Sequence, residues 1–217
     1  MARVIGIGYQ DFADLIDSGC FYVDKTEFIR ALLLGNMKEM NAYMNRIALA
    51  AFSYFDTGNR PSGAEPERFY HGFVLGLMVE LADRYVITSN RESGFGRYDV
   101  MLKPRKDEDD AVILEFKMHD ADEETDLQDT VNAALRQIEA MNYKEALIAE
   151  GISEERIRAY GFGFEGKRVL IGQAGCEERE RGRWRRRPFH DFKPPRPQTF
   201  TKKPVIAMIL LIHILME

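Results

Sequence analysis

The sequence contains few cysteines and histidines, the residues from which disulfides and zinc sites are built. Its 217 residues include two cysteines, Cys20 and Cys176, and four histidines spread along the chain. Two distant cysteines make no disulfide framework, so we expect a reducing, cytoplasmic environment. The closely spaced cysteines and histidines that are typical of zinc sites are also missing.

Long apolar runs and a phosphate-binding loop are missing as well. The apolar run at residues 205–216 includes His213 and is shorter than the roughly 20 residues that span a bilayer, and the first residues do not resemble a signal peptide. We therefore predict no membrane association. No G-x-x-x-x-G-K-[ST] loop for ATP is present. Residues 161–166 (GFGFEG) match a dinucleotide-binding loop in letters, but the strand-like residues 167–171 follow where a helix is needed, which favours a hairpin.

Charge divides the chain into two parts. The net charge is −5, yet ten Lys or Arg face only four acids between residues 175 and 203. Residues 1–174 therefore carry −10, which is unusual for a protein that binds phosphates through Lys and Arg, although a site can be locally basic on an acidic protein. We expect one main domain, with residues 173–217 forming an irregular, basic and proline-rich tail that has a short apolar end.

Hydrophobic spacing predicts an α/β domain. The expected helices cover residues 8–19, 25–34, 36–55, 66–81 and 125–149, and the expected strands cover 21–23, 84–89, 96–103, 111–118, 157–164 and 167–171. The order of helix, three strands, long helix and two strands predicts a sheet with mixed strand directions. The acidic end of the turn at residues 103–110 is expected to be a solvated hairpin tip and not a metal cluster.

The candidate site lies on the strands at residues 96–102 and 111–118. Glu115 and Lys117 project from one face, roughly 6–7 Å apart, because side chains alternate along a strand. Asp99 lies near them if the two strands pair, and Gln137 on the following helix is a fourth candidate. Two carboxylates can hold a hard cation such as Mg²⁺, and an ammonium can orient water or offset charge. A Glu–Lys surface pair with Asp99 capping a turn is the alternative, and spacing alone leaves both open.

Several segments together resemble a known family. They are PERFYHGFVLGL (66–77), SNRESG (89–94), GRYD (96–99), ILEFK (113–117), ALRQI (134–138) and GKRVLI (166–171). In combination they resemble the PD-(D/E)XK nuclease-superfamily domain that lies C-terminal to an AAA-ATPase-like domain in many prokaryotic proteins. The resemblance covers residues 36–172. It implies a restriction-endonuclease-like fold, in which a mixed central sheet is flanked by helices and an N-terminal helical segment precedes it.

The resemblance also implies roles for the candidate residues. Asp99 and Glu115 would bind Mg²⁺ or Mn²⁺, Lys117 would be the catalytic lysine, and Gln137 would match an accessory helix glutamine. The carbonyl of Phe116 is a further possible ligand in such sites. The implied function is metal-dependent hydrolysis of nucleic acid, with DNA favoured. The alternative is an inactive nuclease-like domain that binds protein or nucleic acid.

Residues 1–35 give a second resemblance, to the start of the AAA-ATPase-like partner. Because no ATP-binding loop follows, we interpret this segment as a remnant, expect no ATP hydrolysis, and consider a protein partner in place of the missing ATPase. The oligomeric state is left open. Two residues of the helix at 66–81, His71 and Glu80, could also approach the site, but a structural histidine and a solvated glutamate are the favoured interpretations.

Overall fold

The computed structural model describes residues 17, 24–52, 65–93 and 96–174. Among these residues, no helix is long and apolar enough to cross a membrane. The expected helix at 8–19 (apart from residue 17), the expected strand at 21–23 and the tail beyond residue 174 lie outside the described residues. The domain boundaries expected at residues 35 and 172 remain predictions.

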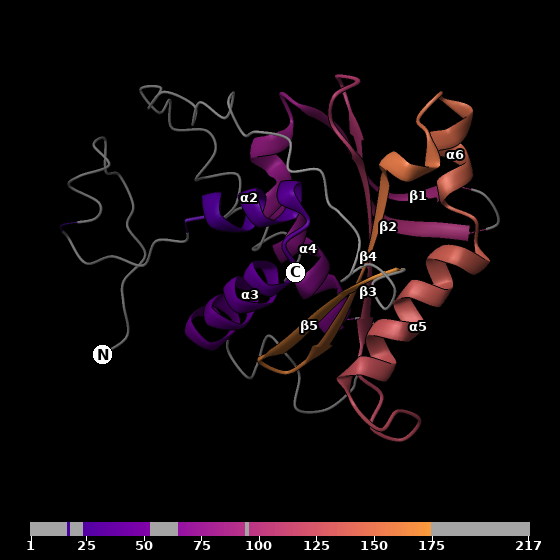
Figure 1. The fold of residues 1–217 in the computed structure, drawn as a ribbon. Helices are drawn as coiled ribbons and strands as arrows, with labels where there is room; N and C mark the ends of the chain where they lie inside the picture. The colour runs from indigo at the N-terminus through magenta and orange to yellow at the C-terminus, as the bar shows by residue number, and fades with distance from the viewer. Residues whose placement is uncertain (1–16, 18–23, 53–64, 94–95, 175–217) are drawn as a thin grey trace. The chain divides into compact units, whose positions relative to one another are not determined.

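The described elements form one five-stranded mixed sheet with helices on both faces (Figure 1). In chain order they are α2 (Thr26–Leu34), α3 (Met37–Ala51), α4 (Glu65–Met78), η1 (Val79–Leu81), β1 (Tyr85–Ser93), β2 (Gly96–Pro104), β3 (Ala111–Met118), α5 (Leu127–Ala140), α6 (Lys144–Ala149), η2 (Glu154–Arg156), β4 (Ile157–Glu165) and β5 (Arg168–Gln173). The strands follow the order β1-β2-β3-β4-β5, in which β3 and β4 are parallel and all other neighbours antiparallel. The predicted restriction-endonuclease-like architecture is confirmed.

The single helix expected at residues 125–149 is wrong, because the chain breaks into α5 and α6. Asn142 has a φ of 55°, in the left-handed region that ends a helix. The turn places Tyr143 and Leu147, both almost fully buried, in a cluster with Met101 and Ile113 of the sheet. One straight helix would have carried these apolar side chains past the sheet.

Glycines allow α5 to lie directly on the sheet. A Cβ atom at Gly161 would lie 2.8 Å from the carbonyl oxygen of Val131, and one at Gly163 would lie 3.1 Å from a side-chain carbon of Leu127. Residues 161–166 are therefore part of β4 and its turn, where Gly166 has a φ of 55° before the chain returns as β5. The expected hairpin is confirmed.

Aromatic side chains fill the opposite face of the sheet, on which α4 packs. Tyr70 stacks on Phe164 with the ring centroids 4.2 Å apart, and Phe116 meets Phe162 edge to face at 5.3 Å. Such ring pairs add stability beyond the burial of their area. In Figure 1, α4 and α5 accordingly lie on opposite sides of β3 and β4. Side-chain alternation therefore directs Phe116 to α4 and its neighbours, Glu115 and Lys117, to α5.

Two asparagines of α3 cover the free edge of β5. Asn41 donates to the carbonyl of Ile171 at 3.0 Å and accepts from its backbone N–H at 2.8 Å. Asn45 makes the same two bonds with Val169, at 2.7 and 3.1 Å. The two side-chain amides thus replace the bonds of a neighbouring strand. They close an edge that could otherwise pair with another chain.

We expect the Asn45→Leu substitution to lower the free energy of unfolding by about 1–3 kcal/mol, because the N–H and C=O of Val169 lose their partner. Urea unfolding followed by circular dichroism measures the change. Asn132→Leu is the matched control, since Asn132 accepts a side-chain bond from Gln128 within α5, and we expect it to shift stability by about 0.5 kcal/mol or less. Equal losses in the two variants would contradict the role given to Asn45.

The acidic turn between β2 and β3 is not purely solvated, which corrects the expectation from sequence. Arg84 binds both carboxylate oxygens of Asp109, with Nε donating at 2.6 Å, and Asp109 is 9% exposed. Arg158 forms an ion pair with Asp110. These acids fix the turn at the end of the sheet through arginines, as bidentate pairs do in other proteins.

Candidate functional site

Asp99 lies where the alternation of faces along β2 is interrupted. Tyr98 and Met101 both join the cluster beneath α5 and α6, so the strict alternation of faces is interrupted between them. Across the β1–β2 pair, Asn90 has a φ of 52°. The Asp99 carboxylate accepts a hydrogen bond from the backbone N–H of Phe116 at 2.8 Å. This hydrogen bond ties Asp99 to the middle of the acid-x-lysine segment of β3.

Glu115 is the most deeply buried acid of the site, at 2% exposure. It pairs in register with Gly161 of β4, so it points to the face that α5 covers. One carboxylate oxygen, Oε1, accepts a hydrogen bond from Nε2 of Gln137 on α5. The other, Oε2, is buried and has no hydrogen-bond partner among the described residues. Such an oxygen is costly to bury unless something else satisfies it.

Burial disfavours the ionised forms of the two acids, and the charge of Asp99 adds to this effect at Glu115. Burial, followed by the charge of Asp99, raises the pKa of Glu115 to about 8, although the charge of Lys117 and the backbone N–H of Asp99 oppose the rise. Burial also raises the pKa of Asp99, although the hydrogen bond from Phe116 opposes this. A positive charge placed between the two carboxylates would relieve both effects.

Lys117 supplies a nearby positive charge. It pairs in register with Gly163, so it shares with Glu115 the face toward α5. Its ammonium lowers the pKa of Glu115 and, as the weakest of the contributions, that of Asp99. The structure thus brings Asp99, Glu115 and Gln137 together by hydrogen bonds through β2, β3 and α5, with the charge of Lys117 beside both acids.

Gln137 belongs to a partly buried network that the sequence did not predict. Its Nε2 also lies 3.4 Å from the hydroxyl of Tyr143, which donates to the carbonyl of Arg97 at 2.7 Å. Tyr143 is fully buried at the break between α5 and α6. The role of Tyr143 could not be predicted from the sequence, because its partner, Arg97, lies 46 residues away in the chain.

Glu67, an acid of α4 that the sequence did not single out, affects the site electrostatically. The charge of Glu67 raises the pKa of both Asp99 and Glu115, whereas Glu80 is exposed in η1. Glu67 lies one turn before His71, so the two share a helix face. The four-residue spacing between Glu67 and His71 is the feature of the sequence that could have identified Glu67. It remains exposed at the start of α4.

His119, which follows the acid-x-lysine segment, serves a neighbouring loop. Its Nδ1 lies 3.1 Å from the Glu124 carboxylate and 3.0 Å from the hydroxyl of Thr130. Thr130 in turn donates to Glu124. These bonds hold the loop between β3 and α5.

The donor set fits a hard divalent cation that keeps part of its water shell. No group of three or more His, Cys, Asp or Glu side chains suited to a metal occurs among the described residues. Asp99 and Glu115 nevertheless supply two carboxylates, and the buried Oε2 of Glu115 is the atom that a cation would satisfy. Mg²⁺ commonly binds through one or two carboxylates and retains several waters.

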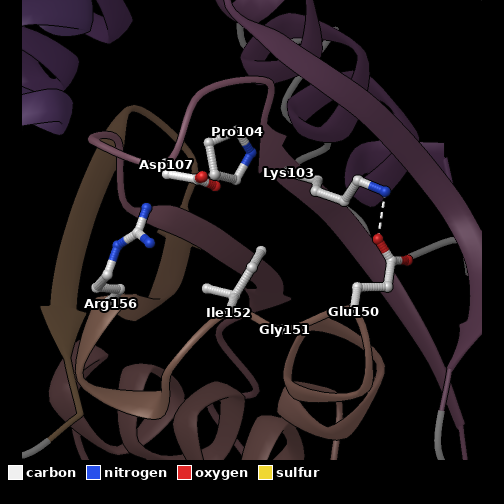
Figure 2. A pocket seen from close by; sticks show the side chains of 7 residues that line it. All are labelled: Lys103, Pro104, Asp107, Glu150, Gly151, Ile152 and Arg156. Carbon is white, nitrogen blue, oxygen red and sulfur yellow. Dashed lines mark hydrogen bonds and ion pairs between the residues drawn. The ribbon is translucent and has the colours of Figure 1, made fainter.

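A shallow hollow of about 150 Å³ lies at the other end of β2 and β3. Figure 2 shows Lys103 and Glu150 joined across one side of it, with Asp107 and Arg156 on the other. None of the four candidate residues lines this hollow. It is separate from the site described above.

Comparison with known proteins agrees with this geometry. A search of curated proteins and a search of solved structures each gave no match. A family model described as the PD-(D/E)XK nuclease superfamily matches residues 65–174. The match begins in α4, ends just beyond β5 and includes all four candidate site residues. Since it covers half of the chain, the protein belongs to the PD-(D/E)XK nuclease superfamily.

Proposed function

We propose that the protein is a metal-dependent nuclease that hydrolyses phosphodiester bonds, with DNA as the favoured substrate. The observation that carries the proposal is a pair of acids with raised pKa values, a half-buried Asp99 and a buried Glu115 that has one oxygen without a partner among the described residues. A purely structural Glu–Lys surface pair does not require a buried acid. Perturbed carboxylates of this kind are typical of functional sites.

Each candidate residue has a role that its surroundings support. Asp99 and Glu115 would hold Mg²⁺ or Mn²⁺, with the carbonyl of Phe116 as a further oxygen donor. The bound ion would polarise a phosphoryl oxygen and lower the pKa of a bound water. Lys117 would orient the attacking water and offset the charge that develops on the phosphate.

Gln137 would position Glu115. Its amide donates to one carboxylate oxygen and leaves the other free to accept a cation. Tyr143 lies behind this amide, close to its nitrogen. A ligating carboxylate held by such a partner keeps its orientation when the site is empty, which reduces the ordering needed on binding.

Cleavage of supercoiled plasmid and of single-stranded DNA by the complete chain tests the proposal. We expect nicked and linear products with Mg²⁺ or Mn²⁺ and none with EDTA. RNA of the same sequence tests the preference for DNA. Absence of cleavage under all metal conditions would contradict nuclease activity and favour the alternative, a nuclease-like binding module, which the net charge of −10 over residues 1–174 also favours.

A further inference from the structure

His71 of α4 contacts the paired segments of β1 and β2 around Asp99. Its Nε2 lies 2.9 Å from the Ser89 hydroxyl and 3.3 Å from the backbone carbonyl oxygen of Asp99. Its Nδ1 lies 3.4 Å from Nδ2 of Asn90. The ring also packs against Phe116, with centroids 5.7 Å apart. One side chain therefore joins α4 to β1, β2 and β3 around Asp99.

The chemistry of these partners assigns the proton on the ring. A carbonyl oxygen only accepts hydrogen bonds, and an amide nitrogen such as Nδ2 of Asn90 only donates them. An imidazole with a proton on Nε2 satisfies both, because Nε2–H donates toward the carbonyl of Asp99 and the hydroxyl of Ser89, and Nδ1 accepts from Asn90.

Besides Ser89, His71 contacts the two residues at which β1 and β2 depart from regular strand structure. Asn90 has positive φ, a conformation that costs free energy in a residue other than glycine. Asp99 lies opposite it, at the interrupted alternation of β2. Its carbonyl faces His71, while its carboxylate accepts from the N–H of Phe116. Asp99 is consequently held at both its main chain and its side chain.

We propose that His71 is a positioning residue, which fixes the backbone at Asn90 and Asp99 and thereby aims the Asp99 carboxylate at the site it shares with Glu115. The expected effect on metal binding rests on the proposed function. The positioning of Asp99 does not, because it can be measured in the metal-free protein. Metal sites depend on supporting residues in this way, because small displacements of a ligand weaken binding.

The experiment compares His71→Phe with Tyr70→Phe in the complete chain. Phenylalanine at position 71 keeps a ring against Phe116 but loses the hydrogen bonds. Tyr70→Phe is the matched control, because Tyr70 donates from the same helix to the backbone carbonyl of Gly166, at the β4–β5 turn. Amide hydrogen exchange of Phe116 by NMR, without metal, reports whether the carboxylate of Asp99 remains in place. Calorimetric titration with Mn²⁺ reports metal affinity.

We expect His71→Phe to speed exchange of the Phe116 amide about 10-fold or more and to weaken Mn²⁺ binding about 10–100-fold. Tyr70→Phe should change neither, even where it lowers the melting temperature equally. His71→Gln should restore both, since its amide nitrogen can take the place of Nε2. Should His71→Phe not fold, His71→Asn, whose shorter amide does not reach the place of Nε2, replaces it with the same expectation.

Two results would overturn different claims. If the wild type binds Mn²⁺ but His71→Phe matches Tyr70→Phe in exchange and affinity, the role of His71 is wrong. If the wild type binds no Mn²⁺, the proposed metal site is wrong, while faster exchange at Phe116 in His71→Phe would still support the positioning of Asp99.

Discussion

Replacing Asp99 by Asn is expected to lower kcat for metal-dependent DNA cleavage by about 10³-fold. Asparagine keeps an oxygen that can accept the hydrogen bond from Phe116, so the strand geometry should persist while the negative charge is lost. Single-turnover cleavage of a labelled duplex, with Mg²⁺ held at saturation for the wild type, measures the change. Titration with Mn²⁺ shows whether the loss follows from weaker metal binding.

The matched control is Asp129→Asn. Asp129 also accepts a hydrogen bond from a backbone N–H, that of Thr125, but it lies in the first turn of α5. We expect this variant to cleave at the wild-type rate. Equal rates for wild type and Asp99→Asn would show that Asp99 is not part of the catalytic machinery.

A lysine pair gives an independent comparison. Lys117→Met should lower kcat about 10²–10³-fold, whereas Lys103→Met, which removes the ion pair with Glu150 at the far end of β2, should not. Residues that act as one unit are not additive, so Asp99→Asn combined with Lys117→Met should be little slower than the slower single variant. Losses that multiply would contradict a shared site.

The second large effect concerns the stability of the metal-free protein as a function of pH. The pKa of Glu115 is about 8 in the folded protein, against 4.5 for an ordinary glutamate. Between about pH 4.5 and pH 8, the folded state therefore retains a proton that the unfolded state has already released. The contribution of Glu115 to stability is complete below about pH 4.5 and is lost as the pH rises through about 8.

Relative to Glu115→Gln, which cannot ionise, the wild type should lose about 3–5 kcal/mol of unfolding free energy between pH 5 and pH 9. Urea unfolding in EDTA at several pH values measures this difference. Asp99 contributes in the same direction, since its pKa is also raised. Parallel pH profiles for the two proteins would show that Glu115 ionises normally.

Bound metal should reverse this pH dependence of stability in the wild type. A cation binds the ionised carboxylate, so Mn²⁺ should release a proton on binding at pH 7, and stabilise the wild type more at pH 9 than at pH 6. Calorimetry in buffers of different ionisation enthalpy counts the protons released. Glu115→Gln should release fewer.

The elements whose sequence signal is local were predicted with little error. The third strand runs from Ala111 to Met118 as expected, and its alternation places Glu115 and Lys117 on one face. The mixed sheet was predicted from the order of the elements alone. These features follow from periodicity within one segment, which depends on neighbours two to four residues away.

Features that depend on distant contacts were missed. The break at Asn142 depends on the burial of Tyr143 and Leu147 against the sheet, and the covered edge of β5 depends on Asn41 and Asn45, more than 120 residues away. Propensity within a segment carries no information on such partners. The ion pair between Arg84 and Asp109 was missed for the same reason.

The sequence by itself determined which residues are available for the chemistry: two acids, a lysine and a glutamine on strands and a helix of predictable type. Only the tertiary structure decided that Glu115 is buried with one oxygen lacking a partner among the described residues, and that His71 of α4 contacts the backbone carbonyl of Asp99. Burial and pKa depend on the low dielectric and the charges that packing brings around a side chain, and these come from segments far apart in the chain.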